Sequence, residues 1–356
     1  MSIFAHPDFD HHEQINFVSD EASGLKAIIA VHNTNLGYAL GGTRFFPYAN
    51  DHAALTDVLR LSRGMSYKSA MARLALGGGK SVIIGHPSTD KNPDLLRAFG
   101  RALEGMNGRY VAAEDSGTSV ADMKIIHETT EHVSGYHEKI DAQGQVRSGD
   151  PSPATAYGCF VGIKAAVEHQ LQRRDLNDLV VGVQGLGSVG FRLARLLHEA
   201  GARLLVTDIN AAVLQQAQEE LGAHVMSPDQ LMRAPMDIFA PCALGGAITP
   251  ETLTHLQATI VAGGANNQLD HPDTGDLLHQ RGICYAPDYV INAGGIIDIY
   301  YERLGTHEPA RVNAHIDGIH ATLMEIFQRS AATDTANSAL ADTIARERLM
   351  PLGKSA

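Results

Sequence analysis

Three glycines in one short segment could hold the phosphates of a dinucleotide. Gly185, Gly187 and Gly190 follow the apolar run 179–183 with the spacing G-x-G-x-x-G, and a helical pattern covers residues 188–200. In this pattern the first glycine permits a tight turn, the second lets the backbone approach a pyrophosphate, and the third lets the helix pack closely on the strand. The segment predicts a dinucleotide site, although the motif alone also fits an ordinary strand-to-helix connection.

An acidic residue at the end of the next expected strand indicates which dinucleotide would bind. Asp208 directly follows the apolar run 203–207. A carboxylate at this place can accept hydrogen bonds from both ribose hydroxyls, and it would repel a 2′-phosphate. The sequence therefore favours NAD over NADP as the cofactor.

Two lysines could carry the reactive chemistry. Lys68 ends an apolar stripe of a helix that Asn50 is expected to cap, and Lys80 stands between three glycines (residues 77–79) and a strand over residues 81–84. Glycines remove side chains where something must approach the backbone, so Lys80 is expected beside an open floor. The stripe consists of Ala54, Val58, Leu61 and Met65.

Two lysines that converge on one cleft suit an α-amino or α-keto acid. One can stay charged and bind the carboxylate, and the other can act as a base, because mutual repulsion and burial favour the neutral amine. Spacing alone leaves two other interpretations open. Lys68 can extend its amine into solvent from the helix end, and the two lysines can be unrelated surface residues.

The chain order predicts an α/β protein of two domains. A strand is expected over residues 24–31, and the polar stretch 136–153 is the best candidate for a linker and hinge. Strands then alternate with helices, which indicates parallel pairing in a doubly wound sheet. Besides the two runs around the glycine turn, these strands are expected at residues 237–240, 258–262 and 283–286, and the chain is helical from about residue 320.

Composition excludes several classes of protein. The formal net charge of −12 and the lack of a basic patch argue against a nucleic-acid partner. No apolar run approaches the ~20 residues of a membrane span and no secretory signal is visible, so we expect a cytoplasmic protein without a membrane partner. The cysteines at 159, 242 and 284 have no C-x-x-C spacing, so neither disulfides nor zinc are expected.

The histidines do not predict a metal site. His127 and His132 resemble a zinc helix superficially, but they are five residues apart and at ~100° per residue point to different faces. His6, His11 and His12 are expected to lie in a solvated tail.

Several blocks in order make the chain similar to the amino-acid dehydrogenases that include leucine, valine, phenylalanine and glutamate dehydrogenases, with leucine dehydrogenase the nearest likeness. The resemblance covers nearly the whole chain. Its blocks are Gly41-Gly42-Thr43-Arg44, Met65-Ser66-Tyr67-Lys68, Leu76-Gly77-Gly78-Gly79-Lys80, Glu114-Asp115, Pro151-Ser152-Pro153-Ala154-Thr155, Gly185-Leu186-Gly187, Pro241-Cys242-Ala243-Leu244-Gly245, Ala265-Asn266-Asn267-Gln268-Leu269 and Pro287-Asp288-Tyr289-Val290-Ile291-Asn292-Ala293-Gly294-Gly295.

The resemblance implies reversible oxidative deamination of an L-amino acid to a 2-oxo acid and ammonia. It implies that Lys68 binds the substrate carboxylate, that Lys80 is the general base that activates water, and that Asp115 hydrogen-bonds the reacting amino group or its water. Gly41 and Met65 would also contact substrate. Thr155 and Asn267 match positions that orient the nicotinamide.

The resemblance also implies the domain roles. Residues 1–140 would form an α/β domain for substrate binding, catalysis and oligomerisation, and residues 150–325 a Rossmann domain for NAD, with the active site in the cleft between them. A helix at about residues 325–356 would pack back on the first domain. A homo-oligomer, dimer or octamer, is expected.

The side-chain pocket is expected to be apolar. The matching positions are Leu40 and Ile299, with Ala113 and Ile296 beside them, and a second carboxylate would be left unpaired there. A branched aliphatic substrate is favoured, with a valine or an aromatic dehydrogenase as the alternative. Three features depart from the leucine-specific members: residues 45–47 (Phe-Phe-Pro), Asp298 and a longer segment at 138–150.

Two rival functions use the same cofactor fold. A 2-hydroxy acid dehydrogenase usually has a histidine base and an arginine clamp, which the lysine pair argues against. An inactive NAD-sensing regulator would be expected to lack Lys80 or Asp115, and both are present.

Overall fold

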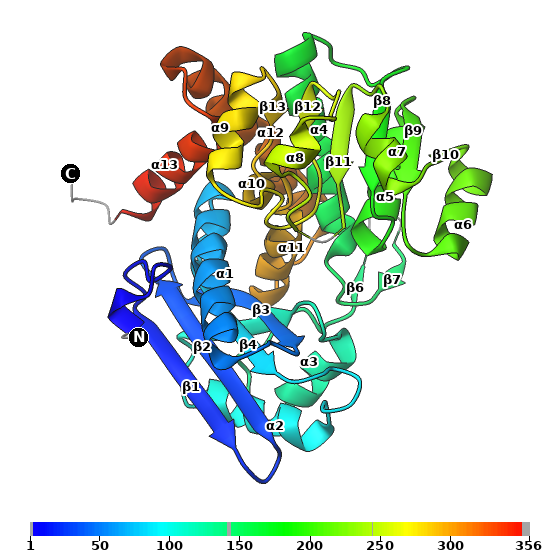
Figure 1. Cartoon of the computed structure of the whole chain (residues 1–356). Coiled ribbons are helices and arrows are strands. Elements are labelled where there is room, and N and C mark those ends of the chain that lie inside the picture. The colour runs from blue at the N-terminus through cyan, green and yellow to red at the C-terminus, as the bar shows by residue number, and fades with distance from the viewer. Residues whose placement is uncertain (1–2, 141–143, 244, 351–356) are drawn as a thin grey trace. The chain divides into compact units, whose positions relative to one another are not determined.

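The computed structural model describes residues 3–140, 144–243 and 245–350, and the chain divides into two compact units (Figure 1). Unit 1 consists of Met1–Asp150, Ile299–Pro309 and Ala345–Ala356. Unit 2 consists of Pro151–Asp298 and Ala310–Ile344. Of the helical C-terminal region, residues 310–344 are thus grouped with unit 2 and those from 345 onward with unit 1.

Unit 1 is built on a mixed sheet with the strand order β1-β2-β4-β3-β5. The strand β1 at one edge is antiparallel to β2, and β2 is antiparallel to β4, while β4, β3 and β5 run parallel. The strands are β1 (Gln14–Asp20), β2 (Leu25–Asn33), β3 (Ala39–Phe46), β4 (Gly77–Ile84) and β5 (Tyr110–Glu114). The sequence predicted β2 but not β1, and it placed the start of β4 at residue 81, whereas the three glycines belong to the strand.

Helices cover both faces of this sheet, and alternation along the strands sorts the side chains between them. Val82 packs with Ala54 and Val58 of α1 (Asp51–Met71), so Lys80 is also on the α1 face. Phe45 packs on the opposite face, in a core shared with α2 (Pro93–Glu104) and α3 (Val120–His127). The residues that alternate with Phe45 on β3, namely Leu40, Gly42 and Arg44, therefore share the α1 face with Lys80.

Helix α1 begins as the sequence predicts, but its buried face is shifted. Asn50 is the N-cap, and its side chain accepts a hydrogen bond from the N–H of Ala53. The expected stripe was only partly right, because Leu61 and Met65 are half-buried. The fully buried side runs instead through Ala54, Val58, Ser62 and Ser66. Small serines occupy it because the helix backbone lies very close to the sheet.

Two of the three N-terminal histidines, His6 and His12, are not solvated. His6 and His12 are 5% and 7% exposed. His12 Nε2 lies 3.0 Å from both the Leu59 carbonyl oxygen and Ser62 Oγ on α1, and His6 Nε2 lies 3.2 Å from Thr56 Oγ1. The prediction was wrong for His6 and His12 because their hydrogen-bond partners lie on α1, far away in the sequence, where a local pattern cannot reveal them. His11 is exposed, as expected.

The polar stretch 136–153 also contains ordered structure. It contains a short hairpin of β6 (Lys139–Ile140) and β7 (Val146–Arg147), and residues 141–143 within it lie outside the described part. Lys139 Nζ lies 2.6 Å from Glu302 Oε2, with both side chains at most 3% exposed. A buried ion pair thus secures a segment whose composition resembles that of a linker.

Unit 2 contains a parallel sheet with the order β10-β9-β8-β11-β12-β13, which confirms the expected doubly wound α/β fold. The order reverses between β8 and β11, beside the glycine turn, and ligands bind at such a switch point. The strands are β8 (Val180–Gln184), β9 (Arg203–Thr207), β10 (His224–Val225), β11 (Ile238–Pro241), β12 (Ile260–Val261) and β13 (Cys284–Tyr285).

Helices alternate with these strands along the chain and continue to the C-terminal region. They are α4 (Ser152–Leu171), α5 (Ser188–Glu199), α6 (Ala211–Leu221), α7 (Pro228–Arg233), α8 (Pro250–Leu253), α9 (Asp273–Gln280), α10 (Asp288–Ile291), α11 (Gly294–Arg303), α12 (Pro309–Thr333) and α13 (Asn337–Leu349). Within unit 1, Arg346 Nε at the end of α13 donates to the Tyr67 hydroxyl at 3.0 Å. Among the described helices, none is long and apolar enough to cross a membrane.

Candidate active site

A buried ion pair lies at the centre of the candidate site in unit 1. Lys80 Nζ is 2.6 Å from Asp115 Oδ2, and the two side chains are 7% and 16% exposed. Burial acts against the charge of Asp115, but Lys80 and Arg44 outweigh it and lower the pKa of this carboxyl to about 2. The pair can hold a proton at a fixed place, which is a requirement of acid–base chemistry.

The sheet brings the pair together across Gly42. Lys80 is on β4, Asp115 directly follows β5, and β3 lies between these two strands. A Cβ atom at Gly42 would lie 3.0 Å from Lys80 Nζ and 2.7 Å from Asp115 Cβ. The absence of a side chain at this position is therefore what lets the amine reach the carboxylate.

Lys68 is positioned by a close approach of α1 to β4. A Cβ at Gly78 would lie 2.0 Å from the backbone nitrogen of Ser66, so the two backbones are nearly in contact. Lys68 and Lys80 each follow this contact by two residues. The expected open floor was wrong, because Ser66 fills the space at Gly78 and the Tyr110 ring fills the space at Gly79. Lys68 and Met65 are half-buried.

The side chains expected to form an apolar pocket are buried in their own units. Leu40 and Ala113 are 1% and 2% exposed and lie on neighbouring strands, β3 and β5. Ile299 is buried in the part of α11 grouped with unit 1, and Ile296 is buried in the part grouped with unit 2. The Gly41 carbonyl oxygen accepts a hydrogen bond from the Tyr110 hydroxyl at 2.8 Å.

Sequence reasoning missed the role of Arg44. Its Nε lies 3.4 Å from Asp115 Oδ2, and its Nη1 donates to Asp57 Oδ2 at 2.8 Å. The signal was present, because Arg44 ends the first family block and Asp57 lies on α1 near the face of Ala54 and Leu61. Only the folded sheet shows that the two residues meet.

Two of the features in which the chain differs from the leucine-specific members, residues 45–47 and Asp298, lie in different surroundings. Phe45 is buried in the core of unit 1, whereas Phe46 is 49% exposed. Asp298 is fully buried at the end of the first segment of unit 2.

The glycine turn of unit 2 has the geometry of a phosphate cradle. Gly185 has φ +94°, and a Cβ at Gly190 would lie 2.0 Å from the Gly185 carbonyl oxygen. Gly187 is the N-cap of α5 and provides no side-chain cap, and a Cβ there would meet nothing within 4 Å. The first N–H groups of α5 have no side-chain cap, and the geometry of the three glycines fits a pyrophosphate site.

Asp208 links the turn to the following strand. Its Oδ2 accepts a hydrogen bond from the Leu186 N–H at 2.6 Å, and its Oδ1 accepts one from the Asn210 N–H at 2.8 Å. A carboxylate has about four acceptor sites, so capacity remains for ribose hydroxyls. The residues present fit a dinucleotide.

Thr155 and Asn267 belong to unit 2 and are held by different contacts. Thr155 Oγ1 donates to the Pro151 carbonyl oxygen at 3.1 Å. A Cβ at Gly295 would lie 2.5 Å from this Thr155 Oγ1. Asn267 is exposed and has φ +51°. Its loop is held by the buried Gln268, whose side-chain amide donates to the carbonyl oxygens of residues 263 and 265. Sequence reasoning gave Gln268 no such role.

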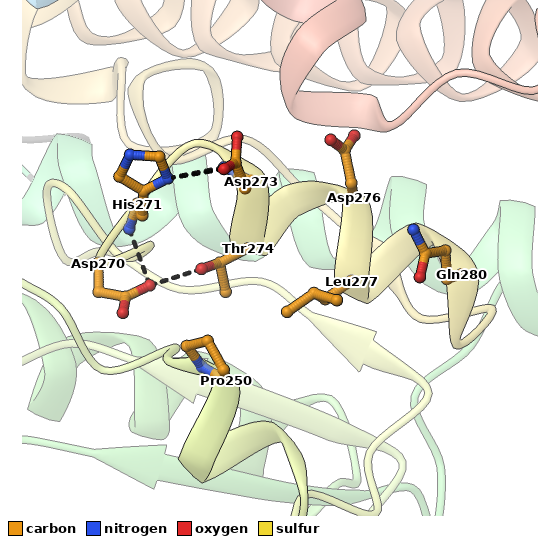
Figure 2. A pocket seen from close by; sticks show the side chains of 8 residues that line it. All are labelled: Pro250, Asp270, His271, Asp273, Thr274, Asp276, Leu277 and Gln280. Atoms are coloured by element: carbon orange, nitrogen blue, oxygen red, sulfur yellow. Dashed lines mark hydrogen bonds and ion pairs between the residues drawn. The ribbon is translucent and has the colours of Figure 1, made fainter.

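A separate pocket of about 440 Å³ in unit 2 does not suit a dinucleotide (Figure 2). It is lined by three aspartates, of which Asp270 Oδ1 accepts hydrogen bonds from Thr274 and the His271 N–H. Asp273 Oδ2 lies 3.3 Å from His271 Nδ1. Carboxylates would repel a phosphate. Among the described residues, no group of three or more histidine, cysteine or acidic side chains is arranged to hold a metal.

Comparison with protein families gives two matches, one in each half of the chain. Residues 11–132 match the Glu/Leu/Phe/Val dehydrogenase dimerisation domain. Residues 209–347 match the Glutamate/Leucine/Phenylalanine/Valine dehydrogenase family.

Similar proteins cover the chain almost end to end. A leucine dehydrogenase from Geobacillus stearothermophilus is 47% identical over 100% of this chain and 95% of its own length. A valine dehydrogenase from Streptomyces albus is 44% identical over 97% of this chain and 94% of its own.

Solved structures give the same picture. The crystal structure of L-tryptophan dehydrogenase from Nostoc punctiforme has a TM-score of 0.80 at 42% identity, covering 95% of this chain and 96% of that one. A hetero-hexameric glutamate dehydrogenase from Thermus thermophilus has a TM-score of 0.78 at 21% identity, covering 97% of this chain and 91% of that one, which shows a shared fold.

Proposed function

The chain belongs to the Glu/Leu/Phe/Val dehydrogenase family and is an amino-acid dehydrogenase, and from that premise we propose its substrate, cofactor and catalytic residues. The proposed reaction is the reversible, NAD-dependent oxidative deamination of a branched aliphatic L-amino acid. Its products are the 2-oxo acid and ammonia. The observation that carries the proposal is the buried pair of Lys80 and Asp115, 2.6 Å apart.

Lys80 is the general base and Asp115 its partner. The neutral amine of Lys80 accepts the proton from the water that attacks the substrate carbon, and Asp115 stabilises the ammonium that results. Asp115 also accepts a hydrogen bond from the substrate amino group. Lys68 binds the substrate carboxylate, with Gly41 and Met65 beside it.

Bound NAD would supply the acceptor for the hydride of the substrate Cα. The protein's part is to bind and orient this group. Gly185, Gly187 and Gly190 hold the pyrophosphate at the start of α5, and Asp208 binds the ribose. Thr155 and Asn267 orient the nicotinamide.

The substrate side chain is proposed to be apolar and branched. The residues proposed to contact the side chain, Leu40, Ala113 and Ile299 of unit 1 and Ile296 of unit 2, are all apolar, and none of them could pair with a second carboxylate, which would be costly to bury. One methylene changes binding by only ~1 to 3 kcal/mol, so leucine, isoleucine and valine are all candidates. The valine and L-tryptophan dehydrogenases among the relatives, at 43–44% identity, support valine or an aromatic amino acid as the second candidate.

The protein is proposed to work as a homo-oligomer, either a dimer or an octamer. The family description of residues 11–132 as a dimerisation domain supports this assembly.

The test follows NADH and NADPH formation with a panel of L-amino acids. Activity is expected with branched aliphatic substrates and NAD, and Lys80→Ala is expected to lower kcat by about 10² to 10⁴-fold because the general base is lost. Lys26→Ala, which removes an exposed lysine of β2, is the control and should keep wild-type rates. No turnover of any amino acid by the wild type, or equal rates for Lys80→Ala and wild type, would overturn the proposal.

A further inference from the structure

The Lys80–Asp115 pair belongs to a longer chain of charged and polar groups, the Arg44 network. It runs from Tyr48 through Asp57, Arg44 and Asp115 to Lys80. The Tyr48 hydroxyl donates to Asp57 Oδ2, which also accepts from Arg44 Nη1 at 2.8 Å. Arg44 Nε is 3.4 Å from Asp115 Oδ2, the same oxygen that Lys80 Nζ approaches at 2.6 Å. One carboxylate oxygen is therefore shared by two cations.

The backbone around Arg44 fixes the position of this network. The N–H of Phe45 donates to the Ser116 carbonyl oxygen at 2.9 Å, and Thr118 Oγ1 donates to the Thr43 carbonyl oxygen at 2.9 Å. The loop after β5 is thus fastened to β3 on both sides of Arg44. On the other side, Asp57 connects the guanidinium to α1. Arg44 has little freedom to leave Asp115.

We infer that Arg44 is a positioning residue that holds Asp115 aligned on Lys80 and opposes the build-up of positive charge on the Lys80 amine. This inference rests on the proposed function, in which Lys80 is the base. Arg44 does so in two ways. Its charge repels the ammonium form of Lys80, and its contact with Asp115 Oδ2 competes with Lys80 for the same carboxylate oxygen. Both effects have the same sign.

The other members of the Arg44 network and the neighbours of Asp115 on β5 carry no positive charge. Asp57 and Tyr48 lie on the far side of Arg44, and burial, together with Asp57, raises the pKa of Tyr48, which keeps it neutral. From β5, burial raises the pKa of Glu114 to about 7, and the buried Tyr110 has a raised pKa and is neutral, so neither carries a positive charge. Arg44 and Lys80 are the positive side chains that lower the pKa of Asp115.

Competitive labelling with acetic anhydride measures this effect without turnover. The extent of acetylation of Lys80 is followed by mass spectrometry across pH in the full-length protein. In Arg44→Met the midpoint for Lys80 should move to higher pH by about 0.5 to 1 unit, and the acid limb of kcat/KM should move with it. Arg44→Lys keeps the charge and should restore most of the wild-type midpoint.

Arg60→Met is the matched control. It removes another arginine that pairs with an aspartate, at 2.7 Å from Asp8, and that is 62% exposed. It should leave the Lys80 midpoint where it is in the wild type. If Arg44→Met does not fold, Arg44→Gln takes its place, since it also lacks the charge but keeps a hydrogen-bond donor, and the same shift is expected.

The outcomes separate the inference from the proposed function. An unchanged Lys80 midpoint in a folded, uncharged Arg44 variant overturns the inference, even if activity falls. An equal shift in Arg60→Met also overturns it, because net charge would then be the cause. A shifted midpoint in a protein that turns over no amino acid supports the role of Arg44 and instead contradicts the proposed function.

Discussion

Glu114 is a carboxyl group whose surroundings favour its protonated form. Burial, followed by Asp150, Asp122 and Asp115, raises its pKa to about 7 from 4.5, and within the described structure its Oε2 is buried without a hydrogen-bond partner. A raised pKa in the folded state means that stability is fully present below about pH 4.5 and is lost as pH rises through about 7. Glu114→Gln should therefore stabilise the protein by about 1 to 2 kcal/mol near pH 8, after allowance for solvent screening, and by little near pH 4.5.

Urea unfolding of both proteins at several pH values measures this difference. Glu21→Gln, at an exposed glutamate in the turn before β2, is the control and should give no pH-dependent difference. A gain in stability for Glu114→Gln that is the same at both pH values would contradict the raised pKa and point to a packing effect instead.

Helix α1 depends on one glycine for its distance from the sheet. In Gly78→Ala the new methyl group would lie 2.0 Å from the Ser66 nitrogen, and a helix backbone cannot yield as a flexible side chain can. The substitution should destabilise the protein by at least about 2 kcal/mol and lower activity, because Lys68 and Lys80 both follow this contact. Urea unfolding and the dehydrogenase assay give the two measurements.

Gly64 provides the matched control on the same helix. A Cβ there would meet nothing within 4 Å, and alanine favours the helix over glycine, so Gly64→Ala should be neutral or stabilising by up to about 1 kcal/mol. If Gly64→Ala and Gly78→Ala lose the same stability, the close contact with α1 does not explain why residue 78 is a glycine.

At the scale of elements, local chemistry decided what the sequence could predict. The unit β8–α5–β9 was located from its glycines, because a tight turn and a helix start are properties of neighbouring residues. The start of β4 was predicted too late in the sequence because glycine is rare in strands. Gly78 is required there because α1, which comes from another part of the chain, lies so close to the strand. The residue blocks pointed to Lys80 and Asp115. The contact of Arg44 with Asp115 could be recognised only from the strand order β4-β3-β5.

At the scale of the whole molecule, the proposed function divides its work between the two units. The residues proposed for the pyrophosphate and ribose, Gly185 to Asp208, belong to unit 2, and Lys68, Lys80 and Asp115 belong to unit 1. NADH alone should therefore slow amide hydrogen exchange first around residues 185–190 of unit 2. At a concentration about 100 times its Kd, the ligand should also stabilise the protein by about 2.7 kcal/mol.

Gly187→Ala sharpens this last prediction, because the two possible effects of the methyl group are separable. The structure has room for it, so stability without ligand should stay close to that of the wild type. The methyl would occupy the place where the backbone approaches the phosphate, so protection by NADH should be lost at the same concentration. Undiminished protection in this variant, or protection by NADH centred on unit 1, would show that the dinucleotide binds elsewhere.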